Sequence, residues 1–181
     1  MSLPSKADIF EYWKDWLDKN GFDWGEPDCW ACKRHWEDRY DVGPKPTWRM
    51  VRAAWNKVPL QRCHIIAKSL GGSDDVSNLF LMCRECHDLA PNTTSREVFF
   101  EWVEKQSWHK RMLKRIQEEI DIFGFTDRIP QVNDIINSED FKTWFLENAG
   151  LHMSQAGDGT HFTISTLFAG VKEYMKQRGQ Q

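Results

Sequence analysis

Long apolar runs are absent from this chain of 181 residues. The longest stretches, such as residues 79–82, are far shorter than the roughly 20 residues of a membrane-spanning helix, so no membrane association is expected. Residues 1–10 lack a basic start followed by an apolar core, so the sequence predicts no signal peptide and a cytoplasmic protein. Repeats and low-complexity tracts are absent too, which excludes solenoid and fibrous classes.

An overall excess of positive charge is also lacking. The 24 basic and 27 acidic side chains give a net charge of −3, which excludes a histone-like polycation. Residues 29–90, however, hold 10 basic and 7 acidic side chains, so the centre is compatible with a phosphate-bearing partner. The 40% of hydrophobic residues, with 10 tryptophans, suffice for a folded core, and we expect most tryptophans to lie in it.

All five cysteines lie in this central segment, and four form two Cys-x-x-Cys pairs, Cys29/Cys32 and Cys83/Cys86. Two such pairs can complete a tetrahedral thiolate shell for Zn²⁺, which would be structural because four sulfur ligands leave no open position. The alternatives are two disulfides or buried free thiols. Fifty residues separate Cys32 from Cys83, so a sizeable segment would be held between the two metal-binding turns.

Apolar periodicity predicts helices on both sides of this segment and within it. They are expected over residues 5–21, 47–58, 94–120, 139–148 and 165–178. Thr94 followed by Glu97 has the pattern of a capping box for the long third helix. We expect Trp48 to face the core, and residues 124–137 to be a connection.

Two short strands are predicted between the cysteine pairs, over residues 64–66 and 78–82. The polar loop that joins them contains Gly71-Gly72. A helical turn is expected to follow from the second cysteine pair and to stop near Pro91.

Within this segment the order is Cys63-His64, the diglycine loop, Asn78 at a strand start, and Cys86-His87. Residues 62–75 (RCHIIAKSLGGSDD) and 77–87 (SNLFLMCRECH) resemble the two halves of the HNH endonuclease motif in its zinc-knuckle subclass. The resemblance covers about residues 29–92. It implies a ββα-metal core, a β-hairpin followed by a helix around one divalent ion.

The expected fold is therefore α+β and mostly α: an HNH core stapled by the four-cysteine zinc site, with flanking N- and C-terminal helices. We expect residues 1–120 to form the nuclease domain with its N-terminal helix and the long helix. Residues 121–181 would form a C-terminal helical region of unknown role.

The resemblance also implies roles for single residues in a metal-dependent hydrolysis of DNA phosphodiester bonds. His64 would be the general base, His87 a ligand of the catalytic ion, and Asn78 would pin the loop and orient His64 or approach the metal. The catalytic ion would be Mg²⁺, Mn²⁺, Ni²⁺ or Zn²⁺. An imidazole, with an ordinary pKa of about 6.5, can accept a proton near neutral pH, and a divalent ion can stabilise the charge that develops on the phosphate.

Two residues depart from the family pattern. Cys63 stands where relatives commonly have an acidic or histidine ligand, and a thiolate suits Mg²⁺ poorly. Cys63 is therefore either a ligand of a softer ion or a buried apolar side chain, and Asp74, Asp75 or Asp88 could substitute in the shell. Pro91 stands where some relatives place another histidine.

The expected partner is DNA, double-stranded, with Arg62, Lys68 and Arg84 near enough to contact phosphates. A homodimer would allow a double-strand cut, and the subclass favours a bacterial or phage-encoded restriction-like or mobile-element enzyme. The basic face of the predicted long helix is either a solvated face or a phosphate-backbone contact. One alternative function is a catalytically degenerate zinc module that binds DNA or a protein partner; another is a nuclease that acts on RNA.

Overall fold

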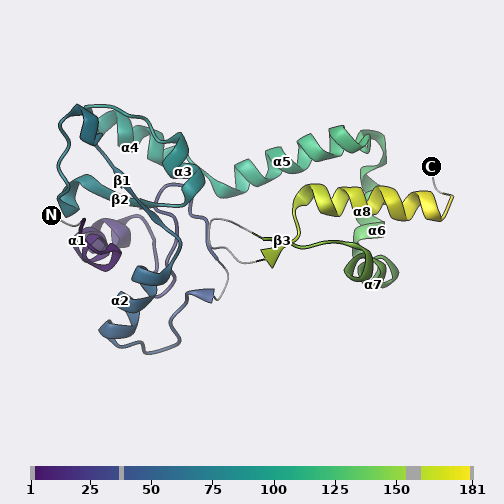
Figure 1. Cartoon of the computed structure of the whole chain (residues 1–181), viewed down its shortest axis with the longest axis horizontal. Helices are drawn as coiled ribbons and strands as arrows, with labels where there is room; N and C mark the ends of the chain where they lie inside the picture. Colours follow the sequence, from purple (N-terminus) through teal and green to yellow (C-terminus); the bar gives the residue numbers. More distant parts are fainter. Residues whose placement is uncertain (1–2, 37–38, 154–159, 180–181) are drawn as a thin grey trace. The chain divides into compact units, whose positions relative to one another are not determined.

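The computed structural model describes residues 3–36, 39–153 and 160–179 (Figure 1). The chain divides into two compact units, Met1–Trp108 and His109–Gln181, called unit 1 and unit 2 below. Both are mainly helical, and each contains one small two-stranded antiparallel sheet. The α+β, mostly α class expected from the sequence is confirmed.

Unit 1 begins with α1 (Lys6–Lys19), which starts where the sequence predicts. Ser5 and Asp8 form a capping box, in which each side chain accepts a hydrogen bond from the backbone N–H of the other residue. The Trp13 indole Nε1 donates to Val76 O and Leu79 O at 3.0 and 2.9 Å. The first helix therefore fastens the start of the second strand.

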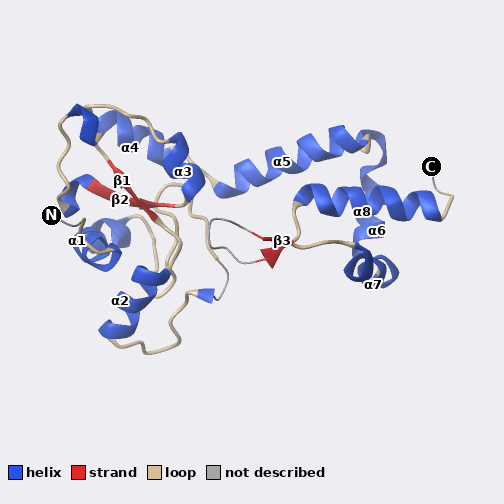
Figure 2. Ribbon diagram, in the orientation of Figure 1, coloured by secondary structure: helices blue, strands red, loops and turns tan. Residues whose placement is uncertain are grey.

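The centre of unit 1 is a hairpin of β1 (Gln61–His64) and β2 (Leu79–Met82) followed by α3 (Arg84–Leu89). His64 pairs with Leu79, and Gln61 with Met82. Two short 3-10 turns, η2 (Lys68–Leu70) and η3 (Val76–Asn78), shape the loop between the strands. This is the ββα arrangement expected from the sequence (Figure 2). Helix α3 contacts both strands, while α1 and α4 both pack against Phe80 of β2.

An aromatic cluster fills the core of unit 1. Phe80, fully buried on β2, packs edge-to-face against five rings, those of Trp13, Trp16, Trp30, Phe99 and Phe100. Such contacts add about 0.5–1.5 kcal/mol per pair to the burial of the rings. Several tryptophans are thus core residues, as predicted.

The second helix, α2 (Trp48–Lys57), is capped by Thr47 and buries Val51 and Trp55. The prediction that Trp48 faces the core is wrong, because its side chain is 40% exposed. Trp48 is the first residue of the helix, and its ring contacts those of Phe10 and Trp24 while part of it stays exposed.

The predicted long helix over residues 94–120 is wrong. It is two helices, α4 (Arg96–Glu104), capped by Ser95 in place of Thr94, and α5 (Trp108–Phe123). The break has a specific cause, since the Trp108 backbone N–H donates to Cys32 O at 2.9 Å and so cannot continue the helical ladder.

Unit 2 comprises most of α5 and the elements that follow it. They are η4 (Thr126–Arg128), α6 (Ile129–Asn137), α7 (Glu139–Asn148), β3 (His152–Met153), β4 (Thr160–His161) and α8 (Ile164–Gln177). The last two helices agree with prediction. The expected connection over 124–137 is wrong in its second half, because Pro130 lies in the first turn of α6, where its missing N–H costs nothing.

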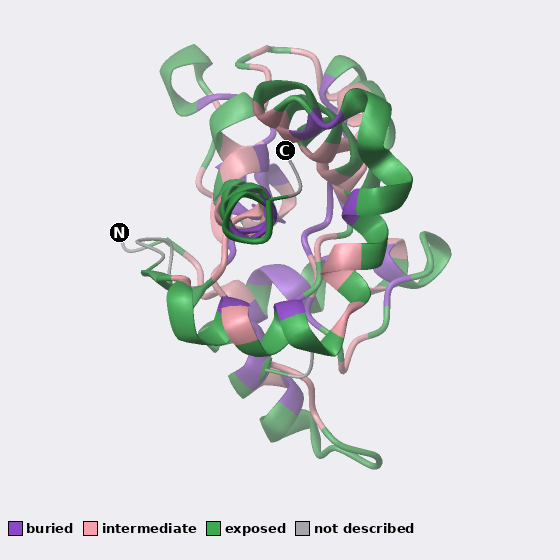
Figure 3. Ribbon diagram, turned by 90° about the vertical axis from the view of Figure 1, so that its right-hand side faces the viewer, coloured by how far each residue is buried: buried purple, intermediate pink, exposed green. Residues whose placement is uncertain are grey.

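The helices of unit 2 bury one side each around a core that includes Phe125, Phe141, Phe145 and Val171. Figure 3 shows this amphipathic pattern, with buried and exposed residues alternating along the helices. Gly170 lets α8 pack closely against Phe145 of α7, since a Cβ at this position would lie 2.7 Å from the Phe145 ring. Across the described residues, every helix is too short or too polar to cross a membrane.

Candidate functional site

The four cysteines of the two Cys-x-x-Cys pairs come together in unit 1. Their sulfur atoms lie within 4.8 Å of one another, and all four residues are buried. The Sγ atoms of Cys32 and Cys83 are 3.9 Å apart, close to the separation of about 3.8 Å that a tetrahedral ion with Zn–S bonds of about 2.3 Å requires. The cluster therefore fits the structural zinc ion expected from the sequence.

Backbone hydrogen bonds shape the first cysteine turn. Cys29 N donates to Arg34 O at 3.0 Å, and Lys33 N donates to Cys29 O at 2.9 Å. Lys33 has a left-handed backbone with φ of 58°, which reverses the chain. Trp30 N donates to Leu81 O at 3.1 Å, so the first turn is tied to β2 as well as to the second cysteine pair.

The cysteines are free thiols, so the alternative of two disulfides is wrong; a disulfide would bring two sulfur atoms to about 2.05 Å. Hydrogen bonds from the thiols of Cys29, Cys32 and Cys86 hold the pKa of Cys83 well below its usual range. Burial raises the pKa of Cys29. At least one thiolate, the form that binds zinc, is thus favoured in the cluster.

The first strand places Cys63 and His64 on opposite faces of the hairpin, as strand alternation requires. Cys63 is buried, its thiol donates to His64 O at 3.7 Å, and burial raises its pKa to about 11. These contacts favour the buried-thiol alternative for Cys63. The His64 side chain is 21% exposed, so its imidazole can be reached from solvent.

Asn78 holds the loop between the strands against the end of β1. It is 5% exposed, its Oδ1 accepts from Ile66 N at 3.0 Å, and its Nδ2 donates to Ile66 O and Ser73 O at 3.0 and 2.9 Å. Gly72 lies against the same atoms, because a Cβ at this position would be 1.8 Å from Ile66 O. The loop therefore has one close-packed conformation at this point.

This loop returns Asp74 to His64. The His64 Nε2 and Asp74 Oδ1 atoms are 2.9 Å apart, and the second carboxylate oxygen accepts from the Lys68 ammonium. Lys68, and then His64, holds the pKa of Asp74 below its usual value. Because an ionised carboxylate only accepts hydrogen bonds, Nε2 carries the proton and Nδ1 keeps the lone pair of the neutral imidazole.

Sequence reasoning missed this pair, since it considered Asp74 only as a substitute metal ligand. The signal that could have revealed the pair is the Gly71-Gly72 turn. Gly71 has a φ of 90°, and a chain reversal there brings residues before and after the turn together.

His87 lies on α3 with a side chain that is 37% exposed, and its Nδ1 is 3.6 Å from Asp88 Oδ1. In the part of the chain that the structure describes, the four cysteines form the one group of three or more potential ligands positioned to hold an ion. His87 is therefore not gathered with Cys63 or Asp74 into a preformed shell, and its role as a ligand stays a prediction.

The three basic residues expected at the phosphates are in different situations. Arg62 Nε donates to Pro4 O at 2.8 Å and is partly buried, and Lys68 is paired with Asp74. Arg84 is 57% exposed, with its Nε 3.7 Å from Asp88 Oδ2. Lys68 and Arg84 therefore have exposed side chains and Arg62 does not, and the role of all three at phosphates stays a prediction.

Comparison with known proteins gives one family. Residues 55–92 match the model of the HNH endonuclease family, and this segment contains β1, the loop, β2 and α3. No curated protein and no solved structure matches the chain. The match confirms the resemblance indicated by the sequence motifs: residues 55–92, called the HNH segment below, are similar to the HNH endonuclease family, which generally supports a nuclease-like function.

Proposed function

We propose that this protein is a metal-dependent endonuclease that hydrolyses phosphodiester bonds in double-stranded DNA. The observation that carries the proposal is the His64–Asp74 pair on the hairpin of the HNH segment. It supplies an accessible imidazole with a fixed orientation, which general-base catalysis of water attack on phosphorus requires.

Several residues of the HNH segment have separate roles in the proposed hydrolysis. Asp74 accepts a hydrogen bond from the Nε2–H group, so Nδ1 of His64 is the atom that takes a proton from water. Asn78 and Gly72 keep the loop, and with it Asp74, in place. The four-cysteine zinc site would hold the two ends of the segment together.

His87 would contribute a ligand to the catalytic divalent ion, which when bound stabilises negative charge on the phosphate and the leaving 3′ oxygen. The expected products therefore carry 5′-phosphate and 3′-hydroxyl ends. A double-strand cut by one such site would call for a second copy of the chain.

The alternative of a zinc module without activity draws on one observation, the buried thiol of Cys63 where the family commonly has a ligand. Such a module would bind duplex DNA with salt-dependent affinity and would not cleave it.

Nicking of supercoiled plasmid tests the proposal. The wild type is compared with His64→Ala and with His109→Ala, which removes an exposed histidine outside the HNH segment. Each protein is assayed with Mg²⁺, Mn²⁺, Ni²⁺ or EDTA after its zinc content and folding have been checked. We expect metal-dependent nicking by the wild type and His109→Ala, and a loss of roughly 10²–10⁴-fold in His64→Ala.

Equal nicking by all three proteins would contradict the assignment of His64. Absence of cleavage of plasmid and of mixed genomic DNA by folded, zinc-loaded wild type would contradict the nuclease proposal and favour the binding module.

A further inference from the structure

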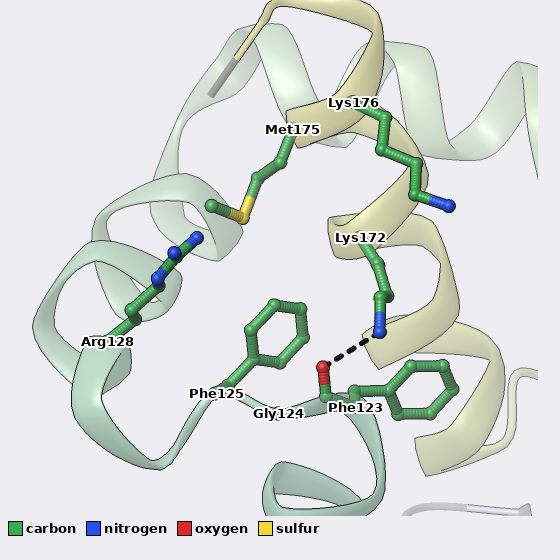
Figure 4. Close-up of a pocket in the computed structure, with 7 residues that line it drawn as sticks. All are labelled: Phe123, Gly124, Phe125, Arg128, Lys172, Met175 and Lys176. Carbon is green, nitrogen blue, oxygen red and sulfur yellow. Dashed lines mark hydrogen bonds between the residues drawn. The ribbon is translucent and has the colours of Figure 1, made fainter. Parts of the chain in front are cut away.

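Unit 2 contains a pocket of about 370 Å³ that the proposed reaction does not use. It lies between the turn after α5 and the last turns of α8 (Figure 4). Its apolar lining comes from Phe123, Phe125 and Met175. Phe125 and Met175 are buried, while Phe123 is half-buried, with its ring inclined by 18° to that of Phe125. The Phe123 ring is thus the aromatic surface of the pocket that is partly accessible, and Lys172 Nζ lies 5.8 Å from its centroid.

Three cations surround this surface, and no acidic side chain is among the lining residues that the structure describes. Arg128 extends from one side toward Met175, and Lys172 and Lys176 lie one turn apart on α8. The Lys172 ammonium donates to Phe123 O at 3.0 Å and keeps two further N–H donors. Within the described chain, the side chains of Arg128 and Lys176 form no hydrogen bond or ion pair.

We propose that this pocket binds a nucleoside phosphate. A phosphate monoester carries about −1.5 to −2 charge at neutral pH, which the three uncompensated cations match. An arginine supplies paired N–H donors to phosphate oxygens, and lysines add mobile point charges. The base would stack on the Phe123 ring, since every base has a flat π-face.

This chemistry distinguishes a nucleotide from simpler anions. Inorganic phosphate lacks a base that could stack on the aromatic surface, and a nucleoside lacks a phosphate that could bind between Arg128 and the lysines. A free mononucleotide and a 5′-phosphorylated single strand offer the same phosphate and base. The site does not depend on the proposed nuclease activity, because a mononucleotide contains no phosphodiester bond to cut.

Isothermal titration calorimetry of the full, zinc-loaded chain without added divalent metal tests the proposal. The probes are dAMP, deoxyadenosine, inorganic phosphate and a short 5′-phosphorylated single strand. We expect dAMP to bind at least tenfold more tightly than deoxyadenosine or inorganic phosphate. Arg128→Ala and Lys176→Ala should each weaken dAMP binding roughly tenfold, the equivalent of one charged hydrogen bond.

Phe123→Leu should weaken dAMP binding and leave phosphate binding unchanged. Lys142→Ala is the matched control, since it removes an exposed lysine of α7 that is paired with Glu139 and does not line the pocket. Circular dichroism establishes that the variants are folded. If the single strand displaces dAMP and binds more tightly, the natural ligand is the end of a DNA strand. If dAMP binds more tightly, the natural ligand is a free nucleotide. Both results support the proposed pocket.

The proposal is overturned by three results. They are an absence of dAMP binding to the folded wild type, inorganic phosphate binding as tightly as dAMP, and dAMP binding that Arg128→Ala and Phe123→Leu leave unchanged.

Discussion

Gly72 is where the loop of the HNH segment tolerates no side chain, and Gly72→Ala is therefore the most demanding test of its packing. The added Cβ would lie 1.8 Å from Ile66 O and 2.9 Å from Asn78 Nδ2. The first of these atoms belongs to the backbone, so the loop itself must move. Overpacking of this kind costs about 1–3 kcal/mol, and a buried Asn78 donor left without its partner costs about 1–3 kcal/mol more. We expect a loss of about 2–6 kcal/mol in the free energy of unfolding of unit 1.

The neighbouring glycine provides the matched control. Gly71 has a φ of 90°, and a Cβ there would meet nothing within 4 Å. Gly71→Ala should therefore cost only the strain of a left-handed alanine, about 1–2 kcal/mol. The two variants make the same chemical change at adjacent positions, and they differ in whether the new atom meets another.

Thermal unfolding followed by tryptophan fluorescence is a suitable assay, because nine of the ten tryptophans lie in unit 1. For a unit of this size we expect Gly72→Ala to lower Tm by roughly 10 °C or more and Gly71→Ala to lower it clearly less. Plasmid nicking should fall in parallel in Gly72→Ala, since the displaced loop carries Asp74 away from His64. Equal Tm values for the two variants would refute the close packing described at Ile66 and Asn78.

Three further predictions concern the same unit. Asp74→Asn should reduce plasmid nicking, by less than the roughly 10²–10⁴-fold expected for His64→Ala, because the base remains but its tautomer is no longer fixed; full activity would contradict the positioning role of Asp74. Cys83→Ser should abolish stoichiometric zinc binding, measured by plasma mass spectrometry, and unfold unit 1, since a structural zinc contributes on the order of 10 kcal/mol; a folded, zinc-free variant would contradict a structural ion. Trp13→Phe replaces the indole by a smaller aromatic ring and removes the donor to Val76 O and Leu79 O, so we expect a loss of about 1–3 kcal/mol in chemical denaturation; an unchanged midpoint would show that these two carbonyls are satisfied without it.

The central segment was predictable from the sequence because its constraints are local and chemical. The two Cys-x-x-Cys pairs predict a common metal site from their spacing, and the four sulfur atoms do converge. The ββα arrangement was implied by the resemblance of residues 62–75 and 77–87 to the HNH motif. The sequence predicts the first strand at residues 64–66, whereas β1 spans Gln61–His64. The reason is that the backbone N–H and C=O of Ile66 bind the Asn78 side chain and so leave the ladder.

The remaining errors arise from contacts between residues far apart in the sequence. The break before α5 depends on a carbonyl of the first cysteine turn, 76 positions earlier, which no local pattern of residues 94–120 reports. The His64–Asp74 pair depends on the conformation of a loop, and conformation is weakly encoded in polar residues. The missed helix α6 is different, since residues 124–137 were predicted as a connection, whereas Pro130 lies in a first helical turn, where proline is common.

The junction between the two units starts at the metal-binding turn. The Trp108 amide, at the first residue of α5, is bonded to Cys32 O, and the Arg34 guanidinium lies 4.7 Å from the Trp108 ring and 5.2 Å from the Trp36 ring. The last residue of unit 1 is thus bonded directly to the backbone of the first cysteine turn. If a zinc ion holds that turn, we expect metal removal to release this hydrogen bond, and a protease that cuts near residues 105–108 would report the metal content of the protein.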